Sequence, residues 1–397
     1  MGPAFVAAIA YVDPGNFATN FAAGASFGYS LAWVIMAANL IAMLVQYLSA
    51  KVGVATGKDL AELCRDQLPR AVTRVLWVQA ELVAMVTDVA EFVGAAIGLN
   101  LLFGMPLPLA GLVTAAVAFG ILALDQRGYR RFELAIIALL GIVLLGFCYD
   151  LAAVHPPAAA VAAGLVPGLG PRGELTLAAG IVGATVMPHV VYLHGALTKS
   201  RKTDGNVADP RALLRSQRFD VVIALGIAGL VNLVMLVVAA AVLDRPGGAG
   251  LGAGGAIVAA HADLARLVGG GAALAFAIAL LASGLSSASV GTYAGQVVMR
   301  GFTGVSVPLF VRRAVTMLPA IIVLAAGLPL TTTLVASQVV LSFGIPFALV
   351  PLVAFTRRRD IMGPLVNRPL TTAAGASAAA AIIALNAYLI YATFALL

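Results

Sequence analysis

Two short polar interruptions in otherwise apolar sequence hold residues that could bind a cation. The first, at residues 13–16, reads DPGN, and the second, at residues 186–189, reads VMPH. Asp13 offers a carboxylate, Asn16 an amide oxygen and Met187 a thioether. One carboxylate among neutral donors suits a cation, and a thioether is accepted by Mn²⁺, Fe²⁺ and their heavier neighbours but contributes little to Mg²⁺ or Ca²⁺. The pattern therefore predicts a site for divalent transition metals.

The backbone at both interruptions is expected to leave the helical conformation for about one turn. Pro14 and Pro188 supply no N–H, and Gly15 tolerates unusual backbone angles. The freed carbonyls most suited to a metal are those of Ala10 and Ala184, each three residues before a side-chain ligand. In a membrane such a break survives where it lines a polar cavity, because lipid offers no partner for a free carbonyl.

Each candidate ligand also has a purely structural explanation. Met187 could fill a gap in the core, and Asp13 could cap a helix or pair with a buried base. Gln338 is a polar residue in an apolar run, and it could contact the metal or join two helices by hydrogen bonds. Two breaks at corresponding positions, one carrying an acid, favour metal binding for Asp13 and Met187, whereas both explanations of Gln338 stay open.

Three further ionisable residues inside apolar segments could move protons. Asp88 and Glu91 are three residues apart, so they share one face of a helix and could pass protons toward the cytoplasm. Histidine ordinarily titrates near neutral pH, which would suit a role of His189 in proton coupling. The alternative is a static network of buried ion pairs, with His189 as an ordinary interior residue. Basic residues that could pair with the acids are Arg201, Arg312 and Arg313.

Composition indicates a polytopic membrane protein with one transmembrane domain over residues 1–397. Hydrophobic residues make up 61% and charged residues 10% of the chain, and the mean hydropathy is +1.02. A soluble domain carries about a quarter charged residues. The net charge of +7 does not indicate nucleic-acid binding, because the basic residues sit in short loops. Cys64 and Cys148 show no metal-ligand spacing and are expected to be free thiols.

Eleven apolar segments are long enough to span a bilayer. The first lacks a basic n-region, so we expect a mature span rather than a signal peptide. Residues 256–268 could form an amphipathic surface helix or a loop with some helix. The eleven segments are 3–27, 30–53, 72–101, 106–124, 132–153, 175–198, 219–243, 270–297, 306–327, 330–355 and 371–396.

Lysines and arginines are distributed very unequally between the two sides of the predicted membrane. One side receives 21 of the 24 basic residues, and only Arg172, Arg245 and Arg266 fall on the other. Positive residues mark the cytoplasmic side. We therefore expect an inner (plasma) membrane protein with its N-terminus in the cytoplasm and its C-terminus outside.

The two breaks lie in segments 1 and 6, which enter the membrane from opposite sides. This is the pattern of an inverted 5+5 repeat whose two discontinuous helices meet near the midplane. The first repeat would cover residues 1–153 and the second residues 175–355, with 371–396 as a peripheral helix. Gly180 and Gly183 precede the second break and lack side chains where helices should approach, so they could serve a moving contact or static packing.

At DPGN and MPH the chain resembles the natural resistance-associated macrophage protein (NRAMP) family of divalent metal transporters, and the resemblance extends over essentially the whole chain. It implies a LeuT-type fold and proton-linked uptake of Mn²⁺ and Fe²⁺, with Cd²⁺ and Co²⁺ also accepted. It further implies that Asp13, Asn16 and Met187 bind the metal together with the Ala10 and Ala184 carbonyls. Residues resembling the proton pathway of the family are Asp88, Glu91 and His189, with Arg201 and Arg313 lining its cytoplasmic end.

Other functions fit the sequence less well. A cation-coupled carrier of amino acids or other organic solutes could share the fold, but Asp13 would repel a substrate carboxylate. An uncoupled metal-selective channel stays open, although broken repeats favour alternating access. An enzyme is not expected, since the four histidines form no HExxH motif. We expect metal ions and protons as substrates, a lipid bilayer as surroundings, no cofactor and no obligate protein partner.

Overall fold

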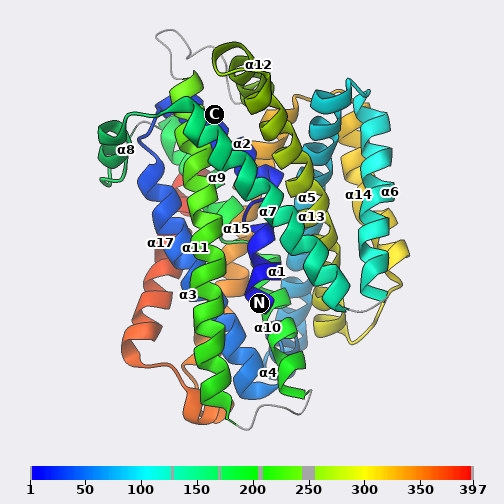
Figure 1. The fold of residues 1–397 in the computed structure, drawn as a ribbon. Helices are drawn as coiled ribbons and strands as arrows, with labels where there is room; N and C mark the ends of the chain where they lie inside the picture. The colour runs from blue at the N-terminus through cyan, green and yellow to red at the C-terminus, as the bar shows by residue number, and fades with distance from the viewer. Residues whose placement is uncertain are drawn as a thin grey trace.

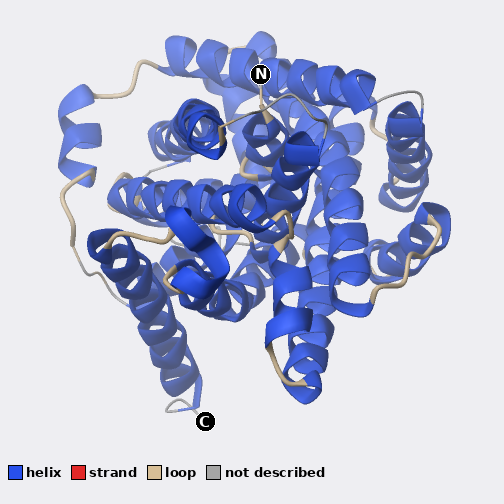
Figure 2. Ribbon diagram, turned by 90° about the horizontal axis from the view of Figure 1, so that it is seen from below, coloured by secondary structure: helices blue, strands red, loops and turns tan. Residues whose placement is uncertain are grey.

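The computed structural model describes residues 2–126, 129–168, 170, 172–203, 209–243 and 255–394. Side-chain surroundings are described for these residues apart from 122–126, 129–132, 172, 200–203, 309 and 393–394. Throughout this part of the chain the regular structure is helical (Figure 2). The predicted all-α class is therefore confirmed.

Each of the eleven predicted spans coincides with a helix or with a broken pair of helices. Within the described residues, eight helices are long and apolar enough to cross a membrane, counting the second broken pair as one. The broken pairs are α1 (Pro3–Ala10) with α2 (Pro14–Phe27), and α9 (Arg172–Thr185) with α10 (Pro188–Thr203). The unbroken helices are α3 (Ala32–Thr56), α5 (Arg70–Phe103), α6 (Leu107–Gln126), α7 (Tyr129–Val154), α11 (Pro210–Leu243), α13 (Gly270–Thr303), α14 (Leu309–Ala325), α15 (Leu330–Thr356) and α17 (Pro369–Phe394).

Short helices connect the spans at both ends of the bundle. They are α4 (Leu60–Gln67), α8 (Ala158–Gly164), α12 (Ala256–Leu267), α16 (Arg359–Met362) and the 3₁₀ turn η2 (Gly363–Leu365). The undecided segment 256–268 forms helix α12, which buries Ile257, Ala260 and Leu264 and contacts α2, α11 and α13. In Figure 1, α8 and α12 lie at the upper end and α4 at the lower end.

The first break lies earlier than its sequence suggested. Residues 11–13 are non-helical, whereas Pro14 opens α2 and residues 14–16 form its first turn. The reason is that a proline fits the first helical position, where its missing N–H would have no helical partner in any case. The second break leaves only Val186 and Met187 outside the helices, so it is shorter than the predicted 186–189: Pro188 opens α10 and His189 lies in its first turn.

Small residues bring the central helices into close contact. A side chain on Gly98 would come within 2.9 Å of Leu281, and one on Gly284 within 2.7 Å of the Ala95 backbone nitrogen. Small residues in the run 283–289 thus permit close packing of α13 on α5. Helix α17 lies at the edge of the bundle against α15, and its C-terminal end stands apart in Figure 2. The division into two inverted repeats stays a prediction.

Candidate metal-binding site

Side chains from distant helices satisfy most of the backbone carbonyls at the first break. Asn232 Nδ2 of α11 donates to the Tyr11 carbonyl at 2.7 Å, and Ser283 Oγ of α13 donates to the Val12 carbonyl at 2.5 Å. The Asp13 carbonyl accepts the first hydrogen bond of α2, from Phe17 N at 3.2 Å. These bonds let a non-helical segment lie inside the bundle, where unpaired carbonyls would be costly.

The Ala10 and Ala184 carbonyls lack their usual helical hydrogen bonds for a common reason, a proline four residues later. In a helix each would accept from the N–H four residues later, but those residues are Pro14 and Pro188. The Ala184 carbonyl instead accepts from Asn16 Nδ2 at 3.0 Å, which joins the two breaks directly. The geometry therefore places the two predicted carbonyl donors at the ends of α1 and α9, beside the non-helical residues.

Asp13 both caps α2 and offers an oxygen to a ligand. Its Oδ1 accepts from the Asn16 backbone N–H and from Asn16 Nδ2, each at 2.8 Å. Its Oδ2 and Asn16 Oδ1 are buried and have no hydrogen-bond partner among the described residues. The capping role and the ligand role thus use different oxygens. Two orphaned oxygens, one from a carboxylate, fit a cation.

Met187 lies in the second break, and Gln338 lies beside the first. Met187 occupies the two-residue linker between α9 and α10 and is fully buried. Gln338 of α15 lies directly against Gly15. A Cβ atom added to Gly15 would lie 2.1 Å from Gln338 Nε2. Its Oε1 is buried without a partner in the described part of the chain. The amide therefore borders the first turn of α2, a position compatible with both of its suggested roles.

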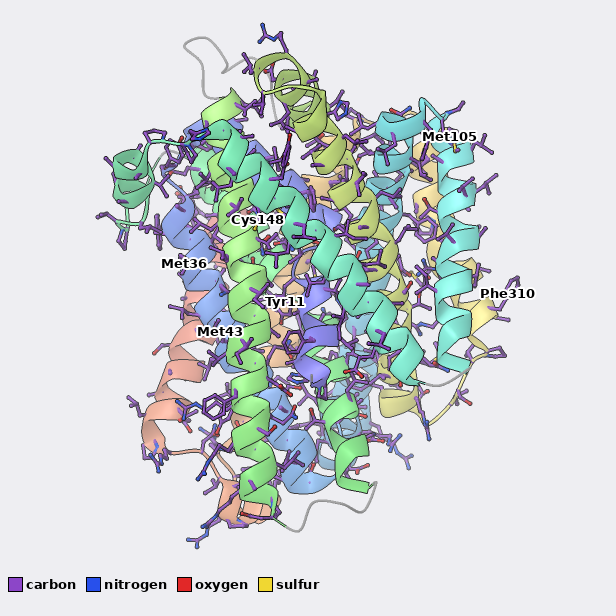
Figure 3. All side chains as sticks on the ribbon, viewed as in Figure 1. Tyr11, Met36, Met43, Met105, Cys148 and Phe310 are labelled. Atoms are coloured by element: carbon purple, nitrogen blue, oxygen red, sulfur yellow. The ribbon has the colours of Figure 1, made fainter. Side chains whose placement is uncertain are left out.

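The site is closed toward both sides of the membrane. Asp13, Asn16 and Met187 are each 0% exposed. Above them, four buried phenylalanines pack with ring centroids 5.0–6.5 Å apart: Phe17 and Phe21 of α2, Phe147 of α7 and Phe276 of α13. Below them, Gln46 Nε2 donates to the Tyr11 hydroxyl at 2.5 Å, and Gln46 Oε1 lies 2.9 Å from His194 Nδ1. Tyr11 is marked beside α1 in Figure 3.

The predicted proton-pathway acids lie on the α5 face nearest the first break. A side chain on Gly94 would come within 1.9 Å of Pro14, and Glu91 precedes Gly94 by one helical turn. Both Glu91 carboxylate oxygens are buried without a hydrogen-bond partner among the described residues, facing Gly291 of α13. Asp88 lies one turn further from the break, 3.8 Å from Arg313 Nη1.

The two arginines near the start of α14, Arg312 and Arg313, lie inside the bundle, as their position within the predicted span 306–327 allows. Arg313 is fully buried, donates to the Ala288 carbonyl at 2.5 Å and to Thr292, and stacks 4.6 Å over the Phe92 ring. Those carbonyl, hydroxyl and aromatic partners compensate its burial. Arg312 pairs with Glu81 at 2.7 Å instead of with Asp88 or Glu91. The side chain of Arg201 lies outside the described residues.

His189 faces α5 from the start of α10. Its Nδ1 lies 3.4 Å from the Thr87 hydroxyl, and its Nε2 is buried without a partner in the described structure. Thr87 neighbours Asp88, so His189 belongs to the same region as the acids. Gly180 and Gly183 both face neighbouring helices: a side chain on Gly180 would meet Thr19, and one on Gly183 the Gln338 carbonyl.

Several residues at the site had no role in the sequence interpretation. Asn232, Ser283 and Gln46 hold the break or close it, and each is a polar residue inside a long apolar segment. Asp150 of α7 is also fully buried, and neither carboxylate oxygen has a partner among the described residues. The signal that could have found all four is the one used for Asp13, a polar side chain within a span.

Comparison with known proteins agrees with this geometry. Residues 4–392 match the family described as "Natural resistance-associated macrophage protein-like" (Nramp). The chain belongs to the Nramp family. Relatives named divalent metal cation transporter MntH are 50% identical in Deinococcus radiodurans, over 98% of this chain and 89% of that protein, and 48% identical in Bacillus subtilis, over 99% and 92%.

Solved structures agree with the assignment of this chain to the Nramp family. A crystal structure of the Eremococcus coleocola manganese transporter superposes with a TM-score of 0.84 at 32% identity, over 97% of this chain and 84% of that one. MhsT in complex with L-phenylalanine matches with a TM-score of 0.60 at 13% identity, over 96% and 98%, and shows the fold alone. The predicted LeuT-type fold is therefore confirmed.

Proposed function

We propose that this Nramp protein imports divalent transition metals, chiefly Mn²⁺ and Fe²⁺ and also Cd²⁺ and Co²⁺, into the cytoplasm together with protons. The observation that carries the proposal is the pair of buried, unpartnered oxygens, Asp13 Oδ2 and Asn16 Oδ1, between two helices broken by proline. The relatives named divalent metal cation transporters and manganese transporter support it.

In the bound state, Asp13 would supply the negative charge and the other donors would complete the shell. Asn16 Oδ1, the Ala10 and Ala184 carbonyls and Met187 Sδ are neutral, so Asp13 would supply the one full negative charge of the ligand set. A buried carboxylate without a positive partner is costly, and a divalent cation removes that cost. The sulfur favours transition metals over the more abundant Ca²⁺ and Mg²⁺. Gln338 would act beside the shell, through its contact with Gly15.

Access would alternate by parting one seal at a time. Opening to the outside requires Phe17 and Phe21 of α2 to separate from Phe147 and Phe276. Opening to the inside requires the Tyr11–Gln46–His194 chain to part. Because both seals are attached to the broken helices or pack against them, movement of the half-helices would expose the metal to one side and then to the other.

Protons would leave the site along α5. Asp13 lies closest to the metal, Glu91 faces the turn of α5 next to Pro14, and Asp88 follows one turn nearer the cytoplasmic end. Arg313 borders Asp88, and His189 lies across the Thr87 contact. The run of ionisable groups along one helix face favours a relay over scattered structural ion pairs.

The unequal distribution of lysine and arginine supports an inner-membrane protein with a cytoplasmic N-terminus and an external C-terminus. An organic-solute carrier of the same fold is disfavoured, because the Asp13 carboxylate at the start of α2 would repel an anionic substrate. An uncoupled channel would let metal through without moving protons, so it differs in a measurable way.

The test is Mn²⁺ uptake into proteoliposomes with the internal pH recorded at the same time. We expect uptake with internal acidification in the parent protein, none in Asp13→Ala, and weakened uptake in Asn16→Ala, where water can replace one neutral oxygen. Parent-like uptake in Asp13→Ala would refute the site assignment. Metal uptake without any pH change would instead support a channel.

A further inference from the structure

A cavity of 560 Å³ lies away from the metal site, between the cytoplasmic ends of α3 and α11 and the segment that joins η2 to α17. Three basic residues line it, one from each of these elements: Lys51, Arg218 and Arg368. We refer to it as the basic pocket. Met43, marked beside α11 in Figure 3, forms part of its wall.

The charge in the basic pocket is not balanced by nearby acids. No aspartate or glutamate lines it within the described chain, and no carboxylate of a described residue pairs with Lys51, Arg218 or Arg368. The acid closest in sequence, Asp220, points elsewhere, since a side chain on Gly2 would occupy the position of its carboxylate.

Lys51 makes the imbalance acute because it is only 5% exposed. Its ammonium donates to Asn367 Oδ1 at 2.7 Å, a neutral acceptor that Thr356 fixes in place. A buried charge without a counter-ion is unfavourable. Arg218 and Arg368 are exposed at the rim, where they can reach an anion that Lys51 contacts from the base.

The walls of the basic pocket favour a lipid over a soluble anion. Val222 lines the pocket and is 50% exposed, and Leu370, which follows Arg368 by two residues, is 82% exposed. Exposed apolar side chains on span helices meet acyl chains, so the basic pocket lies where a headgroup would lie at the cytoplasmic surface. Basic pockets between membrane helices on this side bind anionic headgroups.

We propose that the basic pocket binds the phosphate headgroup of an anionic phospholipid from the cytoplasmic leaflet. The phosphate would accept hydrogen bonds from Lys51, Arg218 and Arg368, and the acyl chains would lie along α11 and α17. The site is separate from the transport pathway and does not depend on which ion is carried.

Native mass spectrometry of the delipidated protein titrated with phosphatidylglycerol tests this assignment, with phosphatidylcholine as the neutral lipid. We expect the parent to bind one phosphatidylglycerol more tightly than phosphatidylcholine. The double variant R218Q/R368Q should bind it about 30-fold more weakly, since each basic residue near an anionic surface contributes about fivefold. The matched control R211Q/R215Q removes two exposed arginines from the same end of α11 that do not line the pocket, and should bind like the parent.

Two results would overturn the proposal. Equal loss of phosphatidylglycerol in R218Q/R368Q and R211Q/R215Q would mean that the whole basic surface, rather than the basic pocket, attracts anionic lipid. Displacement of the bound lipid from the parent by inorganic phosphate would identify the occupant as a soluble phosphate.

Lys51→Gln keeps a donor for Asn367 while removing the charge, and it should weaken phosphatidylglycerol binding about fivefold.

Discussion

The contact between α9 and α15 predicts opposite outcomes for two alanine substitutions one turn apart. At Gly183 an added Cβ would lie 1.9 Å from the Gln338 carbonyl oxygen and 2.9 Å from Ser342 N. Ordinary contacts begin near 3.4 Å, so two backbones would have to separate by roughly 1.5 Å. At Gly180 the nearest atom is the Thr19 methyl at 3.1 Å, which a small side-chain movement relieves.

Overpacking should destabilise Gly183→Ala by about 1–3 kcal/mol, less about 1 kcal/mol gained in helix propensity, whereas Gly180→Ala gains the same propensity without the clash and should be stabilised by up to about 1 kcal/mol. Both variants gain the same helix propensity, about 1 kcal/mol, so the difference between them isolates the contact. Gly183→Ala should also impair Mn²⁺ uptake, because Gln338 lies against Gly15 at the start of α2. Thermal unfolding in detergent and uptake into proteoliposomes are the measurements.

The reasoning fails if Gly183→Ala and Gly180→Ala unfold at the same temperature and transport equally well. A larger residue at Gly180 separates packing from movement. Gly180→Trp would press on Thr19 and Val339 and should slow transport while metal binding persists. Full-rate transport by Gly180→Trp would show that no moving contact exists there.

Three further predictions concern the ligands, the proton route and the break. Met187→Ala should lower Mn²⁺ uptake modestly and Cd²⁺ uptake more, and Ca²⁺ should compete better than in the parent; unchanged competition would return Met187 to a packing role. Asp88→Asn and Glu91→Gln, alone and together, should alter the proton flux or the pH dependence of uptake more than the metal affinity, and unaltered flux would make both residues structural. Asn232→Ala leaves the Tyr11 carbonyl unpaired, so it should destabilise the protein by about 1–3 kcal/mol and reduce Mn²⁺ uptake. Its control is Asn100→Ala, which removes a similar amide-to-carbonyl bond, to Met105 beyond the C-terminal end of α5, and should lower stability alone; equal uptake by the two asparagine variants would contradict a special role of Asn232.

The positions of the breaks could be predicted because their cause is local. A proline removes a hydrogen bond wherever it stands, so 13–16 and 186–189 identified both interruptions without knowledge of the fold. The exact non-helical residues could not be predicted, because a proline can stand just after one helix or as the first residue of the next. Pro14 is the first residue of α2.

The partners of the break could not be predicted, because they depend on which helices face it. Asn232 and Ser283 lie 221 and 271 residues from the carbonyls they bind. Arg313 was predicted as a possible partner of the α5 acids, but the sequence could not show which acid it would meet or that it would be fully buried. Its burial depends on Ala288, Thr292 and Asp88, which come from two other helices.

The pairing of each free carbonyl with a proline four residues later has a consequence for how the site can vary. The oxygen atoms belong to Ala10 and Ala184, but any residue at those positions would carry the same oxygen. What keeps the oxygens available is the absent hydrogen on Pro14 and Pro188. Only a residue with a backbone N–H at position 14 or 188 could donate to these carbonyls in a continuous helix, and proline has none. Two of the proposed metal ligands would thus depend on residues that need not touch the ion.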